Sequence, residues 1–244
     1  MGTAAAVQTR GGSPNEAARC VRAVLSDVET LLNAHCPDSE ISHLASLADT
    51  AVVASCSELV RPCYAAAFGI AKASGGAFSP RWRGNRTLDL GAIAKGFAVD
   101  MAADAVAAEK AGTDVLIDLG GNVKAVRGGW LVGVKNPGGA GFAARVRLRE
   151  GEALATSATY YRGSHIRDGR TGAVVTNGVA SVTVLARSAM VADGLSTALF
   201  VLGPEEGREF LGRLPQAIAG AGDVSVLWIM SDGRMLGGDR WLRD

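Results

Sequence analysis

Helical patterns come first along this chain, and short strand-like segments joined by tight turns follow them. Apolar spacing predicts helices over 16–34, 57–73 and 97–108. Beyond residue 114 the patterns predict strands over 115–117, 130–134, 144–149, 180–185, 224–230 and 235–236, and helices over 193–202 and 204–211. This order lacks the regular βαβ spacing of a doubly wound sheet. The sequence therefore predicts an α+β fold with a largely antiparallel sheet.

The length of the chain indicates the number of domains, and its charge argues against a nucleic-acid partner. A chain of 244 residues suits one large domain or two small ones that share a core, and we expect a single domain over 1–244. Lys and Arg together number 25 and Asp and Glu 24, so the net charge is +1. A general nucleic-acid binder usually carries a basic excess or stripe. We therefore expect no nucleic-acid partner.

The sequence shows neither a membrane span nor an export signal. Its apolar stretches fall well short of the roughly 18 residues that a spanning helix needs. Residues 1–12 contain no basic segment followed by an apolar one, which leads us to expect a cytoplasmic location. The spacing of the cysteines fits no metal site or disulfide framework, so we expect reduced, mostly buried thiols at Cys20, Cys36, Cys56 and Cys63.

The common signatures of nucleotide, zinc and hydrolase sites are absent, but three polar clusters could carry chemistry. The first, over 89–96, places Asp89, two glycines and Lys95 at a predicted helix start. Free N–H groups and the positive end of the helix dipole suit an anion such as phosphate there. The alternative is an ordinary helix-entry turn with a surface lysine.

The other two clusters contain a loop histidine and an Asp/Thr pair. His165 lies in the polar segment 164–172, where it is either a general base or phosphate contact, or part of a surface hairpin turn. Asp193 and Thr197 are four residues apart, so they share one helix face and suit a hard cation such as Mg²⁺. The alternative for Asp193 is a helix N-cap. Together the three clusters favour metal-assisted chemistry on a phosphate or pyrophosphate.

Several segments resemble the motifs of one known family, in the same order along the chain. They are DLGAIAKGFAVD (89–100), DLGGNV (118–123), ATS (155–157), SHIRDGRTG (164–172) and MVADGLSTALFVLG (190–203), and the opening Met1-Gly2-Thr3 matches as well. On these motifs the chain resembles the FAD:protein FMN transferases of the ApbE family over nearly its whole length. The resemblance implies a T-fold-like α+β architecture.

The resemblance also implies a reaction. Members of the family bind FAD with Mg²⁺, move the FMN half onto a Ser or Thr hydroxyl of an acceptor flavoprotein, and release AMP. The bond formed is a phosphoester. Some members instead hydrolyse FAD to FMN and AMP. Two alternatives to the transferase therefore stay open: a Mg²⁺-dependent FAD pyrophosphatase, and an FAD-binding protein without turnover.

Carried over residue by residue, the resemblance assigns the site. The side chains of Asp193 and Thr197 and the backbone carbonyl of Ala92 match the family's metal ligands. His165 matches a histidine proposed as catalytic, and either it or a nearby carboxylate would deprotonate the acceptor hydroxyl. Asp193 is the second catalytic residue that the resemblance implies, through the metal. The positions that match FAD contacts are Met1, His35, Ala77, Phe78, Ser79, Asp89, Lys95, His165 and Ile166.

The chain departs from the family pattern at several positions. Ser79 replaces a usual Asp, and Gly169 replaces a usual Pro. Arg81 stands where Thr is common, and Ala158-Thr159 stands where Gly-Asp is usual. We expect the loss of the carboxylate at Ser79 to weaken a polar contact to the flavin or the metal environment. Since Gly is less restricted than Pro, we also expect Gly169 to loosen the loop that holds His165.

Overall fold

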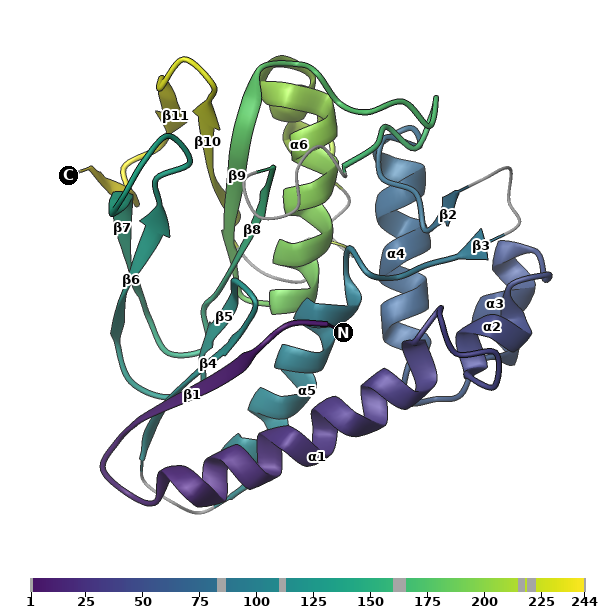
Figure 1. The fold of residues 1–244 in the computed structure, drawn as a ribbon, viewed down its shortest axis with the longest axis horizontal. Coiled ribbons are helices and arrows are strands. Elements are labelled where there is room, and N and C mark those ends of the chain that lie inside the picture. The colour runs from purple at the N-terminus through teal and green to yellow at the C-terminus, as the bar shows by residue number, and fades with distance from the viewer. Residues whose placement is uncertain are drawn as a thin grey trace.

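The computed structural model describes residues 2–82, 87–109, 113–159, 166–214, 218 and 223–243. Its main feature is an antiparallel sheet of seven strands (Figure 1). In spatial order the strands are β1 (Ala5–Arg10), β4 (Asp114–Leu119), β5 (Asn122–Ala125), β8 (Ala153–Ala158), β9 (Val179–Ala186), β10 (Ser225–Met230) and β11 (Met235–Gly237).

Two smaller antiparallel sheets complete the strands of the described residues. One contains β12 (Leu242–Arg243), β7 (Phe142–Leu148) and β6 (Trp130–Lys135). The other pairs β2 (Arg81–Trp82) with β3 (Thr87–Leu88). The helices are α1 (Pro14–Leu32), α2 (Glu40–Leu44), α3 (Asp49–Ser55), α4 (Arg61–Ala73), α5 (Ala94–Ala108) and α6 (Ala189–Gly212).

The large sheet separates two hydrophobic cores, because successive side chains along a strand point to opposite faces. Ile117 and Val184 face the core shared with the helices. Their neighbours Leu116 and Leu185 face a second core, which the sheet of β6, β7 and β12 covers. In Figure 1 α6 lies along β8 and β9, α5 lies beside it, and α1 crosses α5 at one end.

Helices α5 and α6 approach each other closely where α6 begins. A Cβ on Gly96 would overlap the carbonyl oxygen of Ala189 and lie 2.8 Å from the Cβ of Asp193. Only glycine permits this approach without a shift of one helix. Gly96, one of the two glycines in the segment 89–96, therefore permits the close contact between α5 and α6.

Asp100 on α5 fixes the N-terminus of α6. Its carboxylate accepts hydrogen bonds from the backbone amides of Ala189 and Met190, both at 2.9 Å, and from the Ser188 hydroxyl at 2.6 Å. Lys124 on β5 forms an ion pair with the same carboxylate at 2.6 Å. These bonds satisfy helix-end amides that otherwise lack partners, and they tie α5, α6 and β5 together.

A glycine divides α6 into two helical segments. Gly203 has φ 71° and ψ −178°, which is not helical, and Pro204 follows it. Asn177 donates its amide hydrogens to the carbonyls of Phe200 and Val201, at 2.9 and 3.1 Å, and so caps the first segment. The sequence correctly predicts this division after residue 202.

The α+β fold with antiparallel sheet is confirmed, but the sequence patterns miss several elements. The missed elements are β1, β2, β3, β5, β8, β12, α2 and α3. The α6 helix also begins at Ala189, four residues before the predicted start. All four cysteines are free; Cys56 and Cys63 are buried, whereas Cys20 and Cys36 are only partly so. Among the helices described, none combines the length and apolar character needed to cross a membrane.

Candidate functional site

A buried carboxylate, that of Asp193, lies where α6 meets the N-terminus of α5. The residue is only 4% exposed. The Lys95 ammonium contacts its two carboxylate oxygens at 3.2 and 3.3 Å, and the Gly96 amide donates to one of them at 3.0 Å. The start of α5 thus binds an anion, and that anion is a side chain of the protein itself and not the phosphate that the sequence suggests.

The N-cap alternative for Asp193 is wrong. Ser188 is the N-cap of α6 and accepts a hydrogen bond from Val191, so Asp193 is not the cap. Lys95 lies inside α5, its side chain is 24% exposed, and it is paired with Asp193. The segment before α5 does form an entry turn, but Lys95 is an ion-paired, partly buried side chain and not a free surface lysine.

The positive groups around Asp193 do not fully offset its burial. Burial raises the pKa of Asp193, and the charge of Lys95, the Gly96 amide, and hydrogen bonds from the Lys95 and Asn122 side chains lower it less than burial raises it. The pKa of the carboxyl therefore remains above its ordinary value. A further positive charge close to this carboxylate would favour the ionised form.

Thr197 lies one turn after Asp193 and belongs to a cluster of hydroxyl groups. Its Oγ1 is 3.0 Å from the Ser157 Oγ on β8, and Ser157 is 2.8 Å from the Ser196 Oγ. Ser196 in turn donates to the backbone carbonyl of Asp193 at 2.8 Å. The sequence motif ATS contains Ser157, but no role follows from the motif alone.

Ala92 lies in the turn that leads into α5, directly before Ile93. Asp89 shapes this turn, because its Oδ1 accepts the Gly91 amide at 2.7 Å. Lys95 donates to the Gly91 carbonyl at 3.0 Å while it contacts Asp193. The structure therefore brings Asp89, Ala92, Lys95 and Asp193 to one end of α5.

The donor atoms that the motif resemblance assigns to the metal are of the kind that suits a magnesium ion. They are oxygens: the Asp193 carboxylate, the Thr197 hydroxyl and the carbonyl of the Ala92 turn, and Mg²⁺ prefers oxygen ligands. Asn122 adds a second kind of evidence, since its Oδ1 is buried with no hydrogen-bond partner in the described part of the chain. No group of three His, Cys, Asp or Glu side chains that could hold a metal occurs among the described residues. A cation here would thus need additional oxygens from water or a phosphate.

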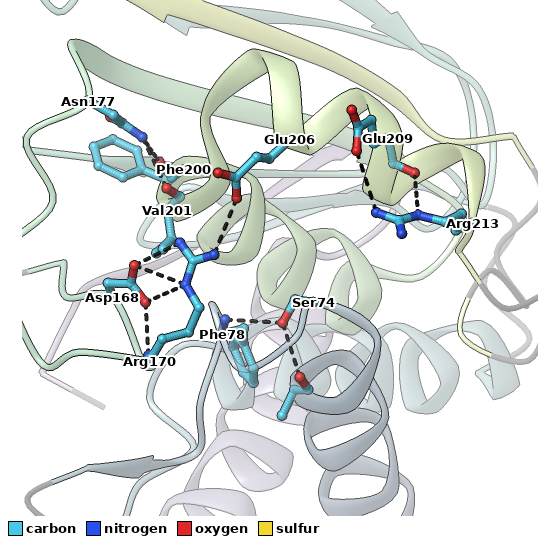
Figure 2. Close-up of polar contacts among 11 residues, drawn as sticks. Ser74, Phe78, Asp168, Arg170, Asn177, Phe200, Val201, Glu206, Glu209 and Arg213 are labelled. Atoms are coloured by element: carbon cyan, nitrogen blue, oxygen red, sulfur yellow. Dashed lines mark hydrogen bonds and ion pairs between the residues drawn. The ribbon is translucent and has the colours of Figure 1, made fainter.

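A second cluster joins the predicted flavin segment 77–79 to the loop after residue 165. The Gly169 amide donates to the Ala77 carbonyl at 3.0 Å. Figure 2 shows Arg170 between Asp168 and Glu206, with N–O distances of 2.8 and 3.3 Å. The Arg170 guanidinium lowers the pKa of Asp168, chiefly through its hydrogen bonds to the Asp168 carboxylate. The loop is therefore fastened both to the segment before β2 and to the second half of α6.

Gly169 packs closely against the segment before β2, while the expected loosening around His165 concerns residues outside the described part of the chain. A Cβ at Gly169 would overlap the Gly76 carbonyl oxygen and lie 2.6 Å from the Cβ of Ser79. A proline here would also lack the amide that donates to Ala77. The two departures, Ser79 and Gly169, therefore face each other, and glycine permits the close contact.

The remaining predicted site residues are buried in the core, lie exposed at the end of α1, or fall outside the described residues. The side chains of Ala77, Phe78 and Ile166 are at most 8% exposed and belong to the main hydrophobic core. His35 is exposed just after the end of α1. Met1 and His165 lie outside the described residues.

Comparison with known proteins gives a consistent result. A family model described as the ApbE family matches residues 81–220. A FAD:protein FMN transferase of Vibrio cholerae is 34% identical over 157 residues, which is 59% of this chain and 44% of that protein. One of Rhodobacter capsulatus is 39% identical over 159 residues, which is 60% of this chain and 28% of that protein. The matched part of this chain thus spans less than half of either relative.

Solved structures show the same fold. The ApbE protein of Thermotoga maritima superposes with a TM-score of 0.75 at 22% identity, over 98% of this chain and 94% of that one. The flavin transferase ApbE of Vibrio cholerae superposes with a TM-score of 0.69 at 21% identity, over 98% of both chains. The α+β architecture built around α5, α6 and the large sheet is therefore shared with these proteins.

Proposed function

The chain belongs to the ApbE family, and we propose that it transfers the FMN half of FAD to a Ser or Thr hydroxyl of an acceptor protein. In this reaction the hydroxyl oxygen forms a bond to the FMN phosphorus. The bond between that phosphorus and the AMP oxygen breaks, AMP leaves, and the hydroxyl proton passes to a base. The products are AMP and an FMN phosphoester on the acceptor.

The buried pair of Asp193 and Lys95 at the start of α5 carries this proposal. The Lys95 ammonium, which is only partly enclosed at the positive end of α5, would supply positive charge to a pyrophosphate. Mg²⁺ would be held by Asp193, Thr197 and the Ala92 carbonyl, and it would neutralise charge on the pyrophosphate as AMP leaves. The family model covers all of these residues, since each lies within 81–220.

The chain's own residues then have distinct tasks. Lys95 supplies a point charge that can move from Asp193 to a phosphate oxygen, because its side chain is not fully enclosed. Asp100 and Gly96 fix the distance between α5 and α6, which sets the positions of Lys95 and Asp193. We propose His165, or a carboxylate near it, as the base that accepts the hydroxyl proton.

The test is to mix the pure chain with FAD, Mg²⁺ and an acceptor domain that carries a flavinylation Ser or Thr. We expect AMP release and a gain of the FMN mass on the acceptor, both lost when EDTA removes the metal. AMP and free FMN without a mass gain would indicate a pyrophosphatase instead. Bound FAD without AMP would indicate a flavin-binding protein without turnover.

A further inference from the structure

Two of the sequence motifs, DLGGNV and ATS, have no role in the proposed reaction, and the large sheet brings them together. The DLGGNV motif ends in β5 and the ATS motif lies in β8, and these strands are neighbours with Asn122 opposite Ala155. Ser157 follows Ala155 by two residues, so both side chains point to the same face of the sheet. Helix α6 packs on that face (Figure 1).

The hydroxyl groups on this face form a chain with a fixed direction. Each hydroxyl has one hydrogen to donate. The Ser196 hydroxyl lies 2.8 Å from the backbone carbonyl of Asp193, which can only accept, so the Ser196 hydrogen points there. The contact of 2.8 Å between Ser157 and Ser196 must then use the hydrogen of Ser157.

The same counting fixes the orientation of Thr197. Because the hydrogen of Ser157 points to Ser196, the contact of 3.0 Å between Ser157 and Thr197 uses the hydrogen of Thr197. Thr197 thus donates toward the sheet, and the lone pairs of its Oγ1 face away from that hydrogen. A metal ligand needs its lone pairs available in this way.

We propose that Ser157 is a positioning residue, which through its hydrogen bonds to Ser196 and Thr197 holds the Thr197 oxygen ready to bind a divalent cation. The side chain of Asn122 independently supports a cation at this place. The residue is 2% exposed and its Oδ1 has no partner among the described residues. A buried oxygen without a partner is costly unless a positive group faces it.

The inference rests on the proposed cation site, so its test measures cation binding apart from turnover. Mn²⁺ replaces Mg²⁺ as the probe, and free Mn²⁺ is followed by electron paramagnetic resonance with FAD present and no acceptor. A blank with FAD alone corrects for Mn²⁺ bound in solution. We expect Ser157→Ala to weaken Mn²⁺ binding by about 10-fold to 100-fold, the usual effect of residues that orient metal ligands.

Two further variants make the result specific. Ser157→Thr keeps the hydroxyl, and we expect it to restore Mn²⁺ affinity to within about threefold of the wild type, far less than the usual loss on removing such a group. Thr156→Val is the matched control. Thr156 is adjacent on β8 and forms a similar hydroxyl contact of 2.9 Å, but with Thr183 on β9. We expect it to bind Mn²⁺ like the wild type.

The outcomes separate this inference from the proposed function. Wild-type affinity in Ser157→Ala, or an equal loss in Thr156→Val, would overturn the positioning role and leave the transferase proposal intact. A wild-type protein that binds no Mn²⁺ would overturn the cation site and this inference with it. The transfer assay with and without EDTA decides separately whether FMN is moved. Thermal melting of each variant shows that the fold is retained.

Discussion

At the scale of single residues, Asp193 and Lys95 depend on each other. The carboxylate is almost fully buried, and the ammonium is the side-chain cation that contacts it in the described structure. Breaking a buried ion pair costs more than the pair itself contributes, because one charge is left without compensation. Stability and ligand binding are therefore coupled at this pair.

Lys95→Met should reveal this coupling. We expect the free energy of unfolding to fall by about 3 kcal/mol, near the lower end for a broken buried pair because Lys95 is partly exposed. Saturating Mg²⁺ should restore part of the loss, since a cation at Asp193 replaces the missing charge. Urea unfolding with and without Mg²⁺ measures both effects. Lys72→Met is the control, as Lys72 is exposed on α4; equal stability of the two variants would contradict the account.

The sequence alone shows that Asp193 and Thr197 share one helix face. It does not show that Ser157 contacts Thr197. The four-residue spacing is a local property, so it survives without knowledge of the fold. Ser157 acquires its contact with Thr197 only because β8 pairs with β9 and α6 packs along both strands. A motif string identifies such a residue, but the tertiary arrangement gives it a task.

At the scale of elements, the contact between α5 and α6 sets the geometry of the site. Gly96 allows the helices to approach, and Asp100 holds the start of α6 through two amides and a hydroxyl. Shifting either helix would separate Lys95 from Asp193. The helix pair is thus part of the functional machinery and not only a support for the sheet.

Gly96→Ala tests this view. We expect a loss of about 1–3 kcal/mol in the free energy of unfolding, as is typical of overpacking, because the new methyl group meets the backbone of Ala189. The rate of FMN transfer should fall by a larger factor than the loss of folded protein explains, because a shift of either helix separates Lys95 from Asp193. Gly212→Ala is the matched control, since a Cβ at Gly212 near the end of α6 meets no atom within 4 Å. Denaturant unfolding and AMP release measure the two properties; a Gly96→Ala protein as active as Gly212→Ala would refute the role of the helix contact.

Long periodic elements were predictable, whereas most of the short ones were not; the three-residue β11 is an exception. The helices α1, α4 and α5 and the break at Gly203 follow from apolar spacing and from a Gly-Pro pair. Strand β1 contains no buried residue and pairs with β4 more than 100 residues away, so only a tertiary contact defines it as a strand. Strands β5 and β8 are short and contain small residues, which weakens their local signal.

At the scale of the whole molecule, the small sheet is fastened over the outer face of the large one. Arg240 contacts both carboxylate oxygens of Glu152 at 3.0 and 2.7 Å and donates to the Arg147 carbonyl at 3.1 Å. Burial raises the pKa of Glu152, but hydrogen bonds from Arg240 and the Arg149 amide outweigh it, so the pKa lies below its ordinary value of 4.5. The pair thus stabilises the folded chain when Glu152 is ionised.

This pair predicts a pH dependence of stability. A lowered pKa in the folded state means that the stabilisation is complete above the unfolded value of 4.5 and is lost as the pH falls through the folded value. Glu152→Gln should be less stable than the wild type by about 1 kcal/mol at pH 7, allowing for the solvent exposure of Arg240. Urea unfolding at several pH values measures the difference, which should shrink below pH 4.5; a constant difference would contradict this role.

The most direct measurement is the intact mass of an acceptor domain after incubation with FAD, Mg²⁺ and either the wild-type chain or Asp193→Asn. The variant keeps the size of the side chain but removes the charge that would hold the cation. We expect the FMN mass on the acceptor with the wild type, and at least about a hundredfold slower modification with Asp193→Asn, as when a key electrostatic group is removed. Circular dichroism should show both chains folded. Modification at the wild-type rate by a folded Asp193→Asn would contradict the central claim.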